Sequence, residues 1–134
     1  MESYPQIFSG IHPIERWPNG DIFWTNGLFV GFLKSFSKEN TIEINLLTGK
    51  KQDKLDLYEV KIELVNNNDQ EIIAKKEYVL SQSNWHTIKI KFDAIRGINE
   101  YKLVIISDSY IPWDLDESID SRELGVAVKN ILLK

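Results

Sequence analysis

The sequence predicts an all-β protein, an antiparallel β-sandwich of the jelly-roll type with about eight strands. Apolar and polar residues alternate in most extended segments, as at Ile42, Ile44 and Leu46, which is the period of a strand buried on one face. Clusters of Gly, Asn, Asp and Ser separate these segments. No segment sustains the 3.6-residue period of an amphipathic helix. The 134 residues are expected to form a single domain, residues 1–134.

The N-terminal quarter combines short extended segments with a loop. Residues 6–8 are expected to form a short strand, and residues 10–21 a loop rich in polar and aromatic side chains. Residues 22–33 are extended on both sides of Asn26-Gly27, a dipeptide that favours a tight turn. This region is therefore either a hairpin or one strand with a kink at Gly27.

The middle of the chain predicts four strands, at 41–47, 57–65, 71–80 and 85–92. Their apolar residues alternate, so that one face of each strand points into the core. The run Asn66–Asp69 predicts a turn, because Asn and Asp tolerate left-handed backbone, and the strand after it pairs back on the strand before it. Residues 93–97 are expected to form a single helical turn that ends at Gly97.

The C-terminal region predicts two strands joined by a long connection. Residues 100–107 are apolar on both faces, which is typical of a central strand. After the connection the sequence alternates again, with Leu124, Val126 and Val128 on one face and Glu123, Gly125 and Ala127 on the other. This alternation predicts a last strand inserted between two others, returning beside an early strand as in a jelly-roll.

Charge and composition exclude several classes of function. The net charge is −4, and lysines are interspersed with glutamates, which argues against a nucleic-acid partner. The absence of cysteine excludes disulfides and thiolate metal sites. The first residues lack the basic start and apolar core of a signal peptide, and no apolar run has the length of a transmembrane helix. We therefore expect a cytoplasmic protein without membrane insertion.

No pattern in the sequence is typical of a catalytic site. The two histidines, His12 and His86, occur without a G-x-S-x-G motif and without the ligand spacing of a zinc site. His86 has the parity of the core residues of its segment, which favours a structural role. One pair of carboxylates, Glu15 with Asp114 or Asp116, leaves a small glycan hydrolase as an alternative. We expect a protein that is not an enzyme.

The four tryptophans and five tyrosines exceed what the core needs. Trp24 and Trp85 lie in predicted strands and are expected in the core. Aromatic side chains in loops lie beside polar ones, as a sugar-binding site requires. The alternative is that these aromatic residues only cover the ends of the sandwich. The candidate ligand-binding residues are Trp17, Tyr110, Trp113, Asp114, Glu15 and Arg122.

The long connection also carries an acidic run, Asp114, Asp116, Glu117 and Asp120. Calcium takes about six to eight oxygen ligands, and acidic loops supply such ligands, so this run is a candidate calcium site. It lacks the spacing of an EF-hand, and the alternative is a solvated loop. No other cofactor is implied.

Asp120 and Arg122 lie two residues apart on an extended chain and therefore share a face. One interpretation is that they hold a sugar or a carboxylated ligand. The other, which we favour, is that Arg122 bonds the carboxylate of Asp120 or Glu15 and ties the long connection to the sandwich.

Two motifs at opposite ends of the chain carry a resemblance. The C-terminal motif is Asp120-Ser121-Arg122-Glu123-Leu124-Gly125-Val126, with an aromatic-Pro segment before it. The N-terminal motif is Gly10-Ile11-His12-Pro13-Ile14-Glu15 followed by Phe23-Trp24-Thr25-Asn26-Gly27. Together they resemble β-sandwich domains appended to bacterial glycosyltransferases and other polysaccharide-biosynthesis proteins. The resemblance implies a β-sandwich fold and the role of an accessory domain.

The sequence thus predicts a noncatalytic, carbohydrate-associated β-sandwich module. Its expected partner is a glycan that it binds, or a polysaccharide-assembly enzyme to which it is accessory. A protein–protein interaction or assembly domain that uses the same edges and loops is the alternative, and the small glycan hydrolase is the third hypothesis.

Overall fold

The computed structural model describes residues 8–18, 20–35, 40–51, 56–93, 99–115 and 120–134. This part of the chain forms strands and one short 3-10 helix, and it contains no α-helix. The elements are β1 (Phe8–Ile11), β2 (Glu15–Trp17), β3 (Gly20–Ser35), β4 (Thr41–Leu47), β5 (Tyr58–Asn66), β6 (Glu71–Leu80), β7 (Trp85–Lys91), β8 (Asn99–Ser107), η1 (Pro112–Leu115) and β9 (Ala127–Leu133).

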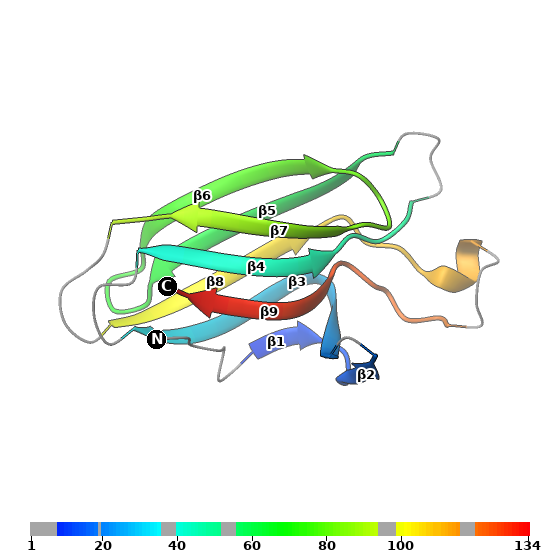
Figure 1. Ribbon diagram of the computed structural model, residues 1–134, viewed down its shortest axis with the longest axis horizontal. Helices are drawn as coiled ribbons and strands as arrows, with labels where there is room; N and C mark the ends of the chain where they lie inside the picture. Colours follow the sequence, from blue (N-terminus) through cyan, green and yellow to red (C-terminus); the bar gives the residue numbers. More distant parts are fainter. Residues whose placement is uncertain (1–7, 19, 36–39, 52–55, 94–98, 116–119) are drawn as a thin grey trace.

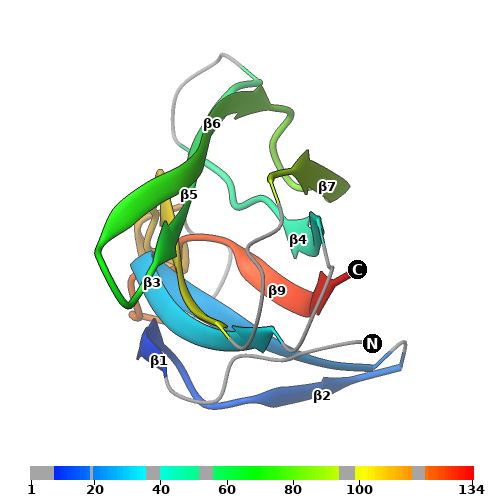
Figure 2. The ribbon, with the colours of Figure 1, turned by 90° about the vertical axis from the view of Figure 1, so that its left-hand side faces the viewer.

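The strands form an antiparallel β-sandwich of the jelly-roll type, as predicted (Figure 1). Their hydrogen-bonded order is β6-β5-β8-β3-β9-β4-β7, and β1 and β2 each pair with β3. We call the strands β6, β5, β8 and the second half of β3 the β6 sheet. The first half of β3 with β9, β4 and β7 is the β7 sheet. Seen from the end, the two sheets face each other across the core (Figure 2).

The long strand β3 belongs to both sheets. Phe23 and Trp24 pair with β9, whereas Leu28 and the residues after it pair with β8. Between these halves Gly27 has a φ of 103°, a conformation that favours glycine. Of the two alternatives that the sequence left open, one strand with a kink at Gly27 is therefore correct.

The main core lies between the two sheets and contains the alternating residues that the sequence predicts. Strand β4 contributes Ile42, Ile44 and Leu46, all fully buried. Strand β8 is central, because it pairs with β3 on one side and β5 on the other. The turn after Asn66 joins β5 to its antiparallel partner β6, as expected. The predicted helical turn at 93–97 lies largely outside the described residues.

The last strand, β9, lies between β3 and β4, which confirms the predicted insertion beside an early strand. The predicted faces of this segment are wrong at Leu124. Val126 and Val128 lie in the main core, but Leu124 packs in a second, smaller core with Ile22, Trp24 and Ala127. The reason is that β9 begins only at Ala127, so Leu124 lies on an irregular segment where strand alternation does not hold.

The segment before β9 packs against the bend of β3 through backbone contacts. Thr25 is fully buried, and its N–H donates to the carbonyl oxygen of Val126 at 2.8 Å. Its own carbonyl oxygen accepts from the N–H of Gly125 at 2.7 Å. A Cβ atom on Gly125 would lie 2.6 Å from the backbone nitrogen of Gly27, so only glycine fits there. The two motifs at opposite ends of the sequence therefore lie side by side.

Candidate functional site

The outer face of the β7 sheet, which points away from the main core, carries the side chains of alternate residues on β4 and β7. The register pairs Leu47 with Trp85, Asn45 with Thr87, and Glu43 with Lys89. These positions have the opposite parity to the core residues Ile88 and Ile90. The side chains on this face are therefore apolar near the start of β7, whereas further along the strand they carry amide, hydroxyl and charged groups.

Trp85 was expected in the core, and this expectation is wrong. Its side chain is 46% exposed, because Trp85 follows the parity of Thr87 and Lys89 rather than that of Ile88. Trp24 is buried as expected, at 7% exposure, but in the second core rather than the main one. An exposed indole on a sheet face is available to a ligand.

Trp17 on β2 lies against Trp85 although the two residues belong to different ends of the chain. Their ring centroids are 6.4 Å apart and the ring planes cross at 89°, an edge-to-face arrangement. Trp17 is 36% exposed, and its indole N–H is 3.4 Å from Glu15 Oε1. β2 and the start of β7 both lie in the right-hand half of the molecule in Figure 1. The two rings form a partly exposed aromatic pair.

A hollow of about 240 Å³ lies beside this pair. It is lined by Trp17, Pro18, Gly20, Ile22, Trp85 and Lys129. Trp17 at the end of β2 pairs with Gly20 at the start of β3. Apolar rings and one ammonium group therefore line the same small space.

Beyond the hollow, polar side chains lie along the outer face of the β7 sheet. The hydroxyl of Thr87 donates to Asn45 Oδ1 at 2.6 Å. Glu43 Oε2 lies 2.6 Å from Lys134 Nζ, and its other oxygen is 3.7 Å from Lys89 Nζ. The hydrogen bond from Lys134 is the main cause that lowers the pKa of Glu43 below its ordinary value. Amide and hydroxyl groups beside an aromatic pair are the groups that bind the hydroxyls of a ligand.

The structure brings together three of the predicted ligand-binding residues, Glu15, Trp17 and Arg122. The guanidinium of Arg122 forms a two-pronged contact with Asp120, with Nη2 2.7 Å from Oδ2 and Nε 3.0 Å from Oδ1. It also lies 3.6 Å from Glu15 Oε2, which is buried and accepts no hydrogen bond from the described residues. The contact predicted between Arg122 and these carboxylates is present.

The same contact sets the charge state of the pair. Hydrogen bonds donated by the side chain and the backbone N–H of Arg122 lower the pKa of Asp120 to about 2. The contact with Asp120 raises the pKa of Arg122. The ion pair between Arg122 and Glu15 ties the long connection to β2. Because both Asp120 oxygens accept from Arg122, Asp120 holds the guanidinium in place within the connection.

The other predicted site residues lie elsewhere or outside the description. Tyr110 packs edge to face on Trp24, with centroids 6.2 Å apart, at the margin of the second core. Asp114 is exposed on η1. The side chain of Trp113 lies outside the described residues. Tyr110 therefore supports the fold of this end of the sandwich.

The candidate calcium site is described only in part. Asp116 and Glu117 lie outside the described residues, and the carboxylate of Asp120 is bonded to Arg122. Among the residues that the structure describes, no three His, Asp or Glu side chains are grouped to hold a metal ion. Calcium binding stays a prediction.

Both histidines contact backbone carbonyl oxygens. His12 Nε2 is 2.7 Å from the carbonyl oxygen of Glu123, and His86 Nε2 is 3.2 Å from that of Ser81. Since a carbonyl oxygen accepts only from an N–H, Nε2 carries the proton in both rings. These contacts give each histidine a structural role, as expected for His86.

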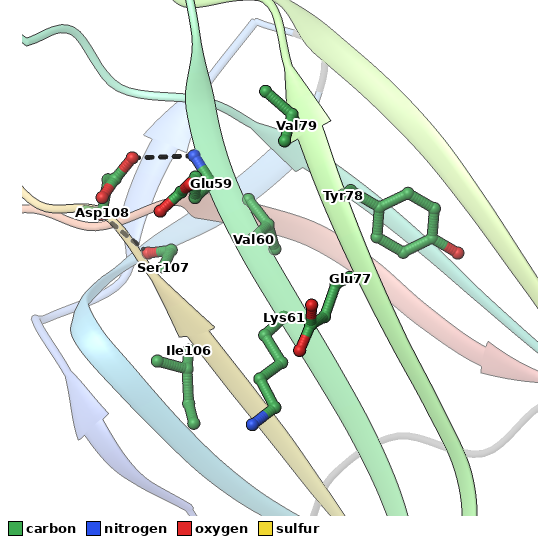
Figure 3. Close-up of a pocket in the computed structure, with 9 residues that line it drawn as sticks. All are labelled: Glu59, Val60, Lys61, Glu77, Tyr78, Val79, Ile106, Ser107 and Asp108. Carbon is green, nitrogen blue, oxygen red and sulfur yellow. Dashed lines mark hydrogen bonds between the residues drawn. The ribbon is translucent and has the colours of Figure 1, made fainter.

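A second, larger hollow of about 360 Å³ lies on the outer face of the β6 sheet (Figure 3). Its side chains come from β5, β6 and the end of β8, and Figure 3 shows Lys61 and Glu77 side by side on neighbouring strands. Tyr78 points away from them, and it packs against the main core. Tyr78 is the one aromatic residue among those lining this hollow, and no pair of exposed indoles lies there as it does at the smaller hollow.

Comparison with known proteins shows the fold. No protein-family model matches the sequence, and no curated protein sequence matches it. CsCBM6-3 from Clostridium stercorarium, solved in complex with cellobiose, matches with a TM-score of 0.61 at 8% identity, over 97% of this chain and 87% of that one. The chain shares the fold of a carbohydrate-binding module.

Further modules agree with this match. The module CBM6cm-2 from Cellvibrio mixtus lichenase 5A, in complex with cellotriose, has a TM-score of 0.57 at 10% identity, over 97% of this chain and 90% of that one. The xylan-binding module CBM15 has a TM-score of 0.54 at 11% identity, over 98% and 89% of the two chains.

In the described part of this chain, no helix is long and apolar enough to cross a membrane.

Proposed function

We propose that this protein is a noncatalytic glycan-binding module whose binding site is the outer face of the β7 sheet around Trp17 and Trp85. The observation that carries the proposal is the exposed pair of indoles beside a hollow, on a sandwich with the fold of carbohydrate-binding modules. The proposed site keeps Trp17 from the predicted ligand-binding residues and adds Trp85, which was expected in the core.

The chemistry of the face suits a sugar. The C–H-rich face of a pyranose ring stacks on an aromatic plate, and burying it removes apolar surface from water. Asn45 and Thr87 lie further along the same face and offer hydrogen bonds to hydroxyl groups. The distance from Trp85 to Lys89 along β7 is roughly 13 Å at about 3.3 Å per residue, which suits a short oligosaccharide.

The affinity is expected to be weak. Sugar hydroxyls exchange hydrogen bonds with water for hydrogen bonds with the protein, at little net gain. A dissociation constant near 1 mM, about −4 kcal/mol, is therefore expected for a short oligosaccharide.

The biological context is a second part of the proposal. The motifs at 10–15, 23–27 and 120–126 resemble the accessory domains of polysaccharide-assembly proteins, and the structure places Thr25 against Gly125 and Val126. We infer an accessory role beside such an enzyme. Capture of a glycosyltransferase by the tagged protein from its native host supports this role, and loss of polysaccharide output on deleting the chain is the second expected result.

Retention by polysaccharide tests the binding proposal. Native gels that contain a panel of soluble plant and bacterial polysaccharides should retard the protein with at least one of them. Trp85→Ala should migrate as it does in a gel without polysaccharide. Val79→Ala, which changes a 59% exposed residue on the β6 sheet, is the control and should be retarded like the parent. Equal migration of all three proteins in every gel contradicts the proposal.

One observation favours a second candidate function, a protein–protein interaction domain. Leu28 and Ile106 are paired on β3 and β8 and are 52% and 39% exposed, next to the larger hollow. Exposed apolar residues that adjoin one another are typical of interaction surfaces. If this face joins two copies, sedimentation should show a dimer that Ile106→Glu dissociates, and a concentration-independent monomer contradicts that function.

A further inference from the structure

The charges around the Trp17–Trp85 hollow differ from those of the chain as a whole. The chain carries a net charge of −4, yet the one charged residue among those lining this hollow is Lys129. On the same sheet face, Lys89 and Lys134 are both paired with Glu43. The positive charges of Lys89 and Lys134 are therefore largely neutralised by Glu43, whereas the charge of Lys129 at the hollow is not.

Within the described part of the chain, the ammonium group of Lys129 has neither an ion pair nor a hydrogen-bond partner. The nearby carboxylate of Glu15 is engaged by Arg122, and Asp120 is bonded to Arg122 as well. The hollow thus holds a cation that the surrounding described residues do not compensate. A bound anion would find no competing carboxylate in the lining.

The fold fixes where this cation lies. Lys129 stands at a register irregularity, because β4 pairs Asn45 with Asn130 and then Leu46 with Val128. This bulge frees Lys129 from the strict alternation of β9. Its Cε atom lies 3.3 Å from where a Cβ on Gly20 would be, and Gly20 is the backbone partner of Trp17. The absence of a side chain at Gly20 leaves room for the lysine stem beside the indoles.

We propose that the preferred glycan is acidic, carrying an anionic substituent that binds Lys129 while its ring stacks on Trp85 or Trp17. This inference rests on the proposed glycan-binding function and specifies its ligand class. The ammonium group is a compact charge with three donors, so it accepts a carboxylate or a sulfate without the planar fit that an arginine demands. The ring supplies the apolar contact, and the anion supplies selectivity.

A matched pair of ligands tests the role of the charge. Trigalacturonate and its full methyl ester share the same rings and linkages, but only the acid is charged. The readout is the NMR shift of the indole N–H signals of Trp17 and Trp85 during titration. The acid should bind about tenfold more tightly than the ester, a difference of about 1.4 kcal/mol, and the difference should shrink in about 0.5 M NaCl. A sulfated galactan trisaccharide titrated in the same way distinguishes sulfate from carboxylate as the preferred anion.

Protein variants test the residue. Lys129→Gln should remove most of the preference for the acid over the ester, whereas Lys129→Arg should retain the preference. Lys89→Gln is the control, since Lys89 lies on the same face but is paired with Glu43, and it should keep the preference. Circular dichroism of each variant shows that the fold is intact.

The possible failures are distinguishable. If the ester binds as tightly as both anionic sugars and Lys129→Gln changes nothing, the charge inference is overturned while glycan binding at the indoles stands. If Lys89→Gln loses the preference as much as Lys129→Gln does, the assignment to Lys129 is overturned. If none of the saccharides, charged or neutral, moves either indole signal, both the inference and the proposed function are overturned.

Discussion

The hydroxyl of Tyr58 lies 2.6 Å from the carbonyl oxygen of Gly125 and also 2.6 Å from that of Asp108. These two carbonyls stand at the two ends of the long connection that leads to β9. Tyr58 itself is fully buried on β5, so a single side chain of the main core anchors both ends of the connection. Burial is the main cause that raises the pKa of this hydroxyl, which therefore stays a donor.

Removal of this hydroxyl should destabilise the fold. Tyr58→Phe leaves both carbonyl oxygens without that donor, and we expect a loss of about 1–3 kcal/mol in the free energy of unfolding. Urea denaturation followed by circular dichroism measures it. Tyr78→Phe is the control, because no hydrogen bond of the Tyr78 hydroxyl is present among the described residues. Equal stabilities of the two variants contradict the anchoring role.

The contact between Gly125 and the bend of β3 leads to a second prediction. In Gly125→Ala the new Cβ would lie 2.6 Å from the backbone nitrogen of Gly27 and 2.6 Å from Thr25 Oγ1. Because these neighbours are part of a buried backbone junction, we expect a loss of about 1–3 kcal/mol. Thermal unfolding of Gly125→Ala beside Ser121→Ala, an exposed position in the same segment, checks it. A melting temperature equal to that of Ser121→Ala would show that the junction relaxes freely.

Arg122→Lys should weaken the Asp120–Arg122 contact within the long connection and the ion pair that this arginine makes with Glu15 of β2. An ammonium group cannot reproduce the two-pronged contact with Asp120. Since the side chain of Arg122 is 36% exposed, solvent screening limits the expected loss to about 1 kcal/mol. Urea denaturation measures the loss. Unchanged stability together with lost glycan binding would instead place Arg122 in the ligand site.

The same pair predicts a dependence on acid. The folded pKa of Asp120 is lowered to about 2, while an unfolded Asp titrates near 3.9. Its contribution to stability is therefore complete above about pH 4 and is lost as the pH falls toward 2. Asp120→Asn should show a shallower fall in melting temperature over that interval than the parent protein. Parallel curves for the two proteins would contradict the lowered pKa.

Calcium binding can be tested through the melting temperature, because an ion that binds only the folded protein stabilises it. If the acidic run of the long connection binds the ion, millimolar calcium should raise the melting temperature and a chelator should reverse the rise. Magnesium at the same concentration is the control for ionic strength, since it favours a smaller octahedral site. An identical melting temperature in all three conditions would leave the run as a solvated loop.

Much of the fold follows from local alternation. In β4, and in β5 as far as Leu64, each core residue is two positions from the next, and those faces are as predicted. The insertion of β9 beside an early strand was likewise predicted, but alternation does not tell which strands flank it, and the structure gives β3 and β4. Alternation fails at Leu124, since that residue precedes the strand and follows the irregular path of the long connection.

The site was harder to predict, for reasons that differ between its residues. Trp85 carried a usable signal, because its parity with Thr87 and Lys89 already placed it on the outer face, yet its size suggested the core. Its contact with Trp17 depends on how β2 folds back beside β3, which no local pattern encodes. Lys129 reaches the hollow through a bulge, and a bulge is set by the pairing of whole strands.

Glycan binding at the Trp17–Trp85 pair can be followed through the indole N–H signals in an NMR titration with bacterial and plant oligosaccharides. Trp24 is an internal control, because it is buried in the second core. We expect the signals of Trp17 and Trp85 to shift while that of Trp24 stays in place. Trp85→Ala should abolish the shift of Trp17 without loss of fold. Stationary signals for both Trp17 and Trp85 with every glycan, or shifts that persist in Trp85→Ala, would contradict it.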